Sequence, residues 1–138
     1  MAYSGFLIKV GSYTVPFCYI NASKYKAGIK GQDLDSYRDA NGILHREALV
    51  NVAIKVELET PSGREEPEIR ILMDNIRRQY SNQTEKKALV TAWMPEIGEY
   101  VTMDCYMPDV EYTIDYADEK TVKYSSFRLA FIGYGGAV

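Results

Sequence analysis

The sequence contains few of the histidine and cysteine residues from which many catalytic and metal sites are built. Its 138 residues include one histidine, His45, and two cysteines, Cys18 and Cys105, that lie far apart. A Ser-His-Asp or Cys-His arrangement would have to use His45, and one histidine with two distant cysteines cannot supply the usual zinc ligand sets. We therefore expect no enzyme activity, no metal and no cofactor, and we expect both cysteines to be buried free thiols.

Clustered positive charge and long apolar runs are also missing. The formal net charge is −3 and the pI is about 5.2, which argues against a protein held to nucleic acid by neutralising phosphates. No apolar run approaches the length of a membrane span, and the first residues carry no basic segment of a signal peptide. We expect a protein made and folded in the cytoplasm, without membrane contact.

Tyrosine is abundant, with 12 residues. This residue favours strands, and it is enriched at protein interfaces because its large apolar ring ends in a polar group. The composition therefore favours a β-rich protein with contact surfaces.

Two segments carry clear periodicity. Residues Val52–Thr60 alternate apolar and polar side chains, which predicts a half-buried strand. Pro67–Tyr80 predicts a helix, because its apolar residues recur at helical spacing and its acidic start and basic end suit the helix dipole. We expect one apolar face to meet the other: Ile69, Leu72, Met73 and Ile76 against Val52, Ile54, Val56 and Leu58.

The remaining pattern predicts strands and hairpins around this pair. The expected segments are Phe6–Val10, Tyr13–Ile20, a hairpin at Tyr37–His45 around Asn41-Gly42, Ala88–Met94, Tyr100–Met107, Val110–Tyr116 and Thr121–Ile132, followed by a flexible tail from Gly133. This order predicts one α+β domain over residues 1–138: a mainly antiparallel β-sandwich or curled sheet with one flanking helix.

The segment 24–46 is long, polar and rich in glycine, with too few apolar residues for a core layer of its own. Loops of this length in compact domains are usually functional or disordered. We interpret it as a loop or hairpin arm that contacts a neighbouring subunit, with Tyr25, Tyr37, Arg38 and Arg46 as candidate interface residues. A mobile surface loop is the alternative.

Several segments resemble a family of small prophage tail proteins from Gram-positive hosts: Tyr3–Pro16, Gly31–Gly42, Ala117–Tyr124 and Phe131–Tyr134. The element order is also similar to that of tail-tube proteins and the first domain of distal tail proteins. The resemblance implies a tail structural subunit in the virion, forming a hexameric ring near the tape-measure and baseplate end. Its partners would be further copies and neighbouring tail proteins, with DNA passing through the ring without specific binding.

Two other functions fit the same sequence. One is a tail-completion or assembly chaperone protein that is absent from the mature particle. The other, from a different class, is a small ligand- or carbohydrate-binding β-sandwich, which would need a concave aromatic pocket and offers Trp93 as its obvious lining residue.

Overall fold

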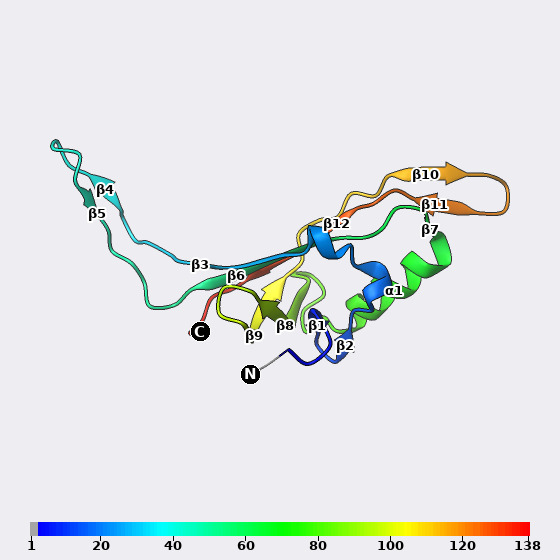
Figure 1. Ribbon diagram of the computed structural model, residues 1–138, viewed down its shortest axis with the longest axis horizontal. Helices are drawn as coiled ribbons and strands as arrows, with labels where there is room; N and C mark the ends of the chain where they lie inside the picture. Colours follow the sequence, from blue (N-terminus) through cyan, green and yellow to red (C-terminus); the bar gives the residue numbers. More distant parts are fainter. Residues whose placement is uncertain (1–2) are drawn as a thin grey trace.

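The computed structural model describes residues 3–138 and shows a large antiparallel sheet with a helix packed against it (Figure 1). The sheet has seven strands in the order β2-β1-β8-β9-β12-β6-β3. These are β1 (Ile8–Val10), β2 (Tyr13–Thr14), β3 (Lys26–Lys30), β6 (Ala53–Glu59), β8 (Lys87–Met94), β9 (Glu99–Tyr106) and β12 (Arg128–Gly133). Every pairing is antiparallel, so the expected α+β class with one flanking α-helix is confirmed.

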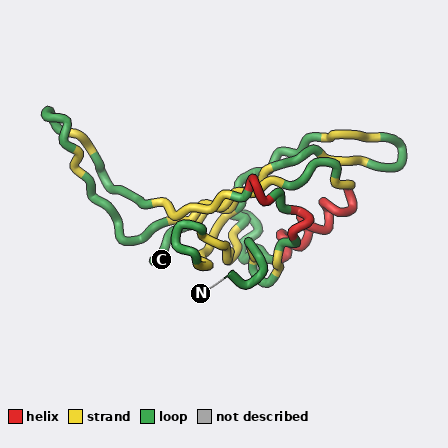
Figure 2. Tube along the Cα trace, in the orientation of Figure 1, coloured by secondary structure: helices red, strands yellow, loops and turns green. Residues whose placement is uncertain are grey.

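The shorter elements project from this sheet or pack against it (Figure 2). Strands β4 and β5 form a two-stranded hairpin, and β10, β11 and β7 form a three-stranded sheet. Their bounds are β4 (Tyr37–Arg38), β5 (Leu44–His45), β7 (Arg64–Glu65), β10 (Ile114–Ala117) and β11 (Val122–Tyr124), with the helix α1 at Glu66–Arg78 and 3-10 turns at Phe17–Tyr19 and Ala22–Lys24.

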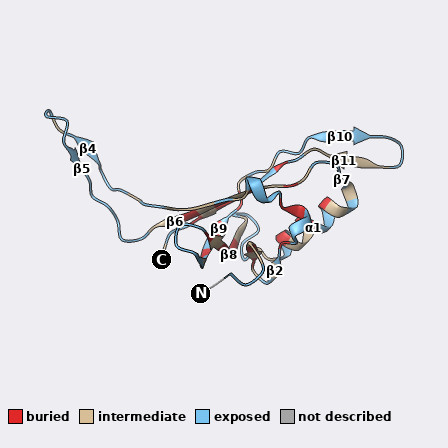
Figure 3. Cartoon of the chain, in the orientation of Figure 1, coloured by how far each residue is buried: buried red, intermediate tan, exposed pale blue. Residues whose placement is uncertain are grey.

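The core lies where the inner face of the sheet meets α1 (Figure 3). Ile54, Val56 and Leu58 of β6 are fully buried, and they share one hydrophobic cluster with the buried stripe of α1. The expected packing of these two faces is therefore confirmed, except that Val52 is only partly buried. Because β3 also contacts β8, the sheet curls around this core.

Hydrogen bonds connect both ends of α1 to the N-terminal segment of the chain. The hydroxyl of Tyr19 donates to the carbonyl oxygen of Glu68 at 2.8 Å. At the other end, the side-chain oxygen of Gln79 accepts from the amide of Ser12 at 3.0 Å. Gly11 precedes this contact with φ +58°, and a Cβ there would collide with the Gln79 side chain, so the β1–β2 turn requires glycine.

Three strand predictions were too long. The second strand ends at Thr14, and Phe17–Tyr19 forms a 3-10 turn, because Pro16 cannot donate a ladder hydrogen bond. This turn leaves Cys18 exposed, against the expectation of a buried thiol, whereas Cys105 is buried. In the segment 110–116 only the end is a strand, and the expected strand 121–132 is divided into β11 and β12.

The segment after β12 is hydrogen-bonded to Val52, so it does not form the flexible tail that the sequence predicts. Val52 and Gly136 exchange two backbone hydrogen bonds of 2.8 and 2.9 Å. Gly133, where we expected the tail to begin, is the last residue of β12. The segment that follows β12 therefore lies against the start of β6.

Truncation of the core should cost much of the stability. We expect Leu72→Ala and Ile54→Ala each to lower the free energy of unfolding by about 2–5 kcal/mol, since both side chains are fully buried. Denaturant unfolding followed by circular dichroism measures this. Ile71→Ala is the matched control on the same helix: its side chain is 57% exposed, and the change should stay within about 0.5 kcal/mol. Equal losses at positions 71 and 72 would contradict the packing.

Candidate assembly surfaces

Residues 31–52 form an arm that continues the β3–β6 ladder away from the core (Figure 1). The ladder runs from Lys26 opposite Glu57 to Lys30 opposite Ala53. Beyond it, the amide of Leu34 donates to the carbonyl of Glu47 and the amide of Leu49 to that of Gln32, both at 2.8 Å. Strands β4 and β5 then close the tip. The arm is thus one long, interrupted hairpin whose root lies in the main sheet.

The tip of the arm is built around Asp39. One carboxylate oxygen of Asp39 accepts from the amides of Asn41 and Ile43 at 2.9 and 3.0 Å, and Gly42 has φ +79°, as the expected Asn-Gly turn requires. The other oxygen contacts Nε2 of His45 at 2.9 Å. The hydrogen bond from His45, followed by that from Ile43, lowers the pKa of Asp39.

Two further contacts hold the arm in shape. The ring of Tyr37 stacks on His45, with 4.9 Å between the centroids. Nearer the root, Arg46 donates from Nε and Nη2 to the two carboxylate oxygens of Asp33 at 3.0 and 2.7 Å. This hydrogen bonding lowers the pKa of Asp33 and raises that of Arg46. This bidentate pair joins the two strands of the arm to each other and holds their spacing.

Apolar side chains on the arm are left uncovered. Six of them are at least 44% exposed: Leu34, Tyr37, Ile43, Leu44, Leu49 and Val50. Val50 is 90% exposed. Their concentration on one element makes the arm a candidate contact surface.

The structure separates the four candidate interface residues into two groups. Tyr37, Arg38 and Arg46 lie on the arm, where Arg38 donates to the carbonyl of Gly42 at 2.9 Å. Tyr25 lies in the body instead: its hydroxyl donates to the carbonyl of Trp93 at 2.8 Å, and burial raises its pKa well above the ordinary value. The sequence predicts Tyr25 to lie on the arm, but the polar residues that follow it form β3, which pairs with β6 in the main sheet, so Tyr25 belongs to the body.

A second projection lies at the other end of the molecule, where β10 and β11 form a hairpin (Figure 1). Asp118 shapes its turn, since one carboxylate oxygen accepts from the amides of Lys120 and Thr121 at 2.8 Å and the other accepts from the hydroxyl of Tyr116 at 2.7 Å. Tyr116 and Ile114 are each 50% exposed. The sequence predicts a strand over Val110–Tyr116; the structure has a strand only at Ile114–Ala117, and every residue of this strand is exposed.

Within residues 3–138, no group of three or more His, Cys, Asp or Glu side chains is arranged to hold a metal ion. In the same range, no helix is long and apolar enough to cross a membrane.

The fold is that of a curled antiparallel β-domain with one packed helix and a hairpin projecting from each end (Figure 1). The sequence matches a family model over residues 1–134, and the chain belongs to that family, which is described as a family of unknown function (DUF6711). No curated protein matches the sequence.

Among solved structures, the fold is similar to a chain in the virion of a native gene transfer agent particle. The TM-score is 0.54 and the sequence identity is 13%, with 98% of this chain and 96% of that chain covered. At this identity the likeness concerns the fold, and it extends over nearly the whole chain.

The shape of the arm should depend on pH through Asp39. Because the folded-state pKa of Asp39 lies below 3.8, its ordinary value, the contact stabilises the tip above that value, and this stabilisation is lost as the pH falls through the folded pKa. We expect the amide NMR signals of Asn41 and Ile43 to shift toward unstructured positions in acid. Asp39→Asn keeps an oxygen for both amides and should remove most of this pH dependence. An unchanged titration in that variant would contradict the assignment.

Proposed function

We propose that this chain is a structural subunit of a virion and, within it, a ring-forming subunit of the tail, of the distal-tail or tail-tube type. The arm carries this proposal, because a hairpin that exposes six large apolar side chains outside the core needs a partner surface. The likeness of nearly the whole chain to a component of a gene transfer agent virion supports it.

The two ends of the molecule differ, and this favours a head-to-tail contact. The arm lies at one end and the β10–β11 hairpin with α1 at the other (Figure 1). When two different surfaces meet in repeated copies, the assembly is heterologous, and it closes into a ring if the rotation between copies allows it. In the proposed tail, neighbouring tail proteins stack on this ring near the tape-measure and baseplate end, and DNA passes through it without specific contacts.

The side chains that could have supported an enzyme or ligand-binding role have structural partners. His45 contacts Asp39 and stacks on Tyr37 at the arm tip. The ring of Trp93 packs edge-on against Tyr100 and Tyr3, with centroids 5.2 and 5.6 Å apart. We therefore propose that the chain acts through assembly and carries no catalytic residues.

Removal of the arm should separate folding from assembly. Lys30 lies opposite Ala53, so residues 32–51 can be replaced by a two-residue Asn-Gly turn that joins the strands directly. We expect a folded protein with a near wild-type melting transition that stays monomeric in mass photometry, where the full chain forms rings.

Point variants provide the matched control for that deletion. Ile43→Ser with Leu44→Ser should also abolish rings, because it removes apolar surface from the tip without altering the core. Leu89→Ser on β8, where the leucine is similarly exposed (51%), should assemble normally. Normal rings from the shortened chain would show that the arm is not the assembly element.

A separate measurement tests whether this chain is a component of the mature virion. We expect mass spectrometry of purified virions to detect this chain at a fixed, multiple copy number relative to the other tail proteins. Presence during assembly with absence from mature particles would instead identify a completion or chaperone protein.

A further inference from the structure

A hollow lies on the outer face of β3 and β6, the face that is turned away from the core. In the β3–β6 ladder, Lys26 stands opposite Glu57 and Gly28 opposite Lys55, whereas Val56 between them is buried on the inner face. The hollow has a volume of about 200 Å³, and its lining residues are Lys26, Ala27, Gly28, Lys30, Lys55 and Glu57. We call this surface the lysine hollow.

Gly28 lies at the floor of the lysine hollow, although the strand does not require glycine there. Its φ is outside the left-handed region, and the register of β3 with β6 runs through it without a bulge. A Cβ at Gly28 would meet only the end of the Lys30 side chain, with Nζ at 3.7 Å, which is ordinary contact. Glycine weakens the interior of a strand, and it often marks a place where a ligand or another backbone approaches closely. The open space over Gly28 therefore favours a ligand from outside the chain.

Two ammonium groups at the hollow have no carboxylate partner. Lys26 and Lys30 are exposed, and neither forms an ion pair within the described residues 3–138. Glu57, the one carboxylate that lines the hollow, is already bound by Lys55 at 3.1 Å and by Arg128 at 2.9 Å. The lysine hollow therefore presents two uncompensated positive charges, in a chain whose formal net charge is −3.

A phosphate group is the ligand that suits these side chains. Lysine binds phosphate as a point charge, without the fixed planar geometry of arginine. Two lysines beside an open floor can therefore hold a phosphodiester in the same way at any base sequence. Contacts of this kind position DNA without reading it, which agrees with DNA that passes through a ring without specific binding.

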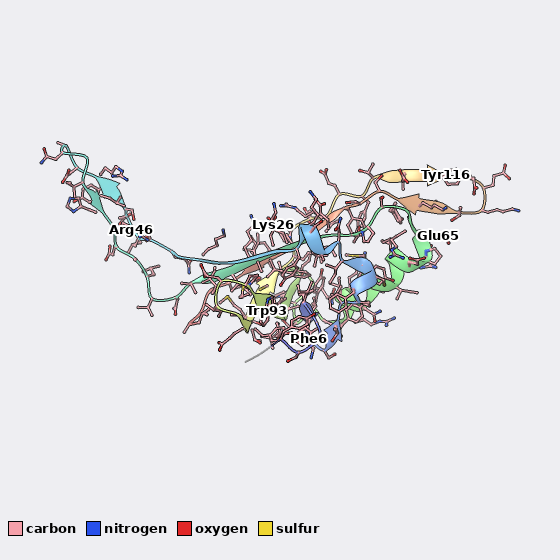
Figure 4. The ribbon with its side chains drawn as sticks, in the orientation of Figure 1. Phe6, Lys26, Arg46, Glu65, Trp93 and Tyr116 are labelled. Atoms are coloured by element: carbon pink, nitrogen blue, oxygen red, sulfur yellow. The ribbon has the colours of Figure 1, made fainter. Side chains whose placement is uncertain are left out.

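The lysine hollow lies on the body of the molecule, away from both projecting hairpins. Along the long axis, Lys26 lies between Arg46 of the arm and Tyr116 of β10 (Figure 4). A ring whose contacts form through the two ends would leave this face open to solvent.

We propose that the lysine hollow binds a phosphate group of DNA, with Lys26 and Lys30 contacting the phosphate oxygens over Gly28. Each subunit of a ring would then offer one sequence-independent contact to the passing duplex. This inference rests on the proposed function, which brings DNA to the assembled subunits.

Protection of the sheet edge is the competing explanation for the two lysines. β3 is the last strand of the main sheet, and lysines on an edge strand discourage pairing with other chains. This accounts for Lys26 and Lys30 but not for Gly28, because a residue with higher strand propensity would serve an edge equally well.

Removal of charge tests the contact. We expect fluorescence anisotropy with a labelled DNA duplex to show binding that weakens between about 50 and 200 mM salt. Each contacting subunit should add roughly −1.8 to the slope of log affinity against log salt concentration, since two lysines neutralise phosphate. Lys26→Gln should halve this slope, and Lys26→Gln with Lys30→Gln should nearly abolish it.

The matched control makes the same change in net charge at another place. Lys120→Gln with Lys123→Gln alters the β10–β11 hairpin and should leave the slope unchanged. Equal losses in the two double variants would show a general charge effect and would overturn the proposal.

A steric variant separates the shape of the hollow from its charge. Gly28→Val keeps both lysines and favours the strand, yet its side chain fills the floor, so the affinity for DNA should fall several-fold. Gly31→Val, just beyond the end of β3, is the control, because a Cβ there has no atom within 4 Å; it should bind DNA as the wild type does. Thermal melting checks that both variants fold. Unchanged binding by a folded Gly28→Val protein would contradict the assignment to this hollow.

Ring assembly is measured on the same proteins by mass photometry, and the lysine variants should form rings normally. Loss of rings in Lys26→Gln with Lys30→Gln would identify a contact with an acidic protein surface and overturn the DNA contact. Displacement of DNA by millimolar inorganic phosphate, but not by chloride at the same ionic strength, would identify a site for free phosphate and overturn it too. A wild-type protein that forms rings without binding DNA would overturn this inference alone, whereas one that stays monomeric would overturn the proposed function.

Discussion

The pairing of β3 with β6 is the constraint on which the rest of the structure depends. β6 places Ile54, Val56 and Leu58 in the core on one face, and its ladder with β3 sets the root of the arm. A slip of one residue in this register would turn the buried face of one strand toward solvent. The burial that stabilises the core therefore also fixes where, and in which direction, the arm projects.

The sequence predicts elements best where local periodicity and core burial coincide. This holds for β6 and α1, whose apolar residues face each other. The segment Val110–Tyr116 alternates equally well, yet it leads into a hairpin beyond the core, and Tyr112 is 40% exposed. Alternation indicates that a segment can be half-buried, but tertiary packing decides whether a layer exists to bury it. β3 shows the reverse case, a strand without clear alternation. It lies at the edge of the sheet and has a lysine at each end, so its sequence resembles that of a loop.

The candidate surfaces were only partly predictable for a related reason. Asn41-Gly42 indicates a hairpin from four neighbouring residues, so the tip of the arm could be foreseen. The pairing of Arg46 with Asp33 spans 13 positions, and no local pattern specifies it. The hollow beside α1 is still less visible in the sequence, because Met73, Tyr112 and Tyr124 line it from three separate parts of the chain. Contacts of this kind depend on the fold and leave no periodic trace in the sequence.

The division of contacts within the arm has a thermodynamic consequence. Polar interactions, such as those of Asp39 and Arg46, shape the hairpin, but they leave its apolar side chains in water. A two-stranded hairpin is marginally stable by itself, and ordering it in advance lowers the entropy lost on binding. Any partner that binds only the ordered arm must stabilise it by mass action. In the proposed ring, the order of the arm and the extent of assembly are therefore linked.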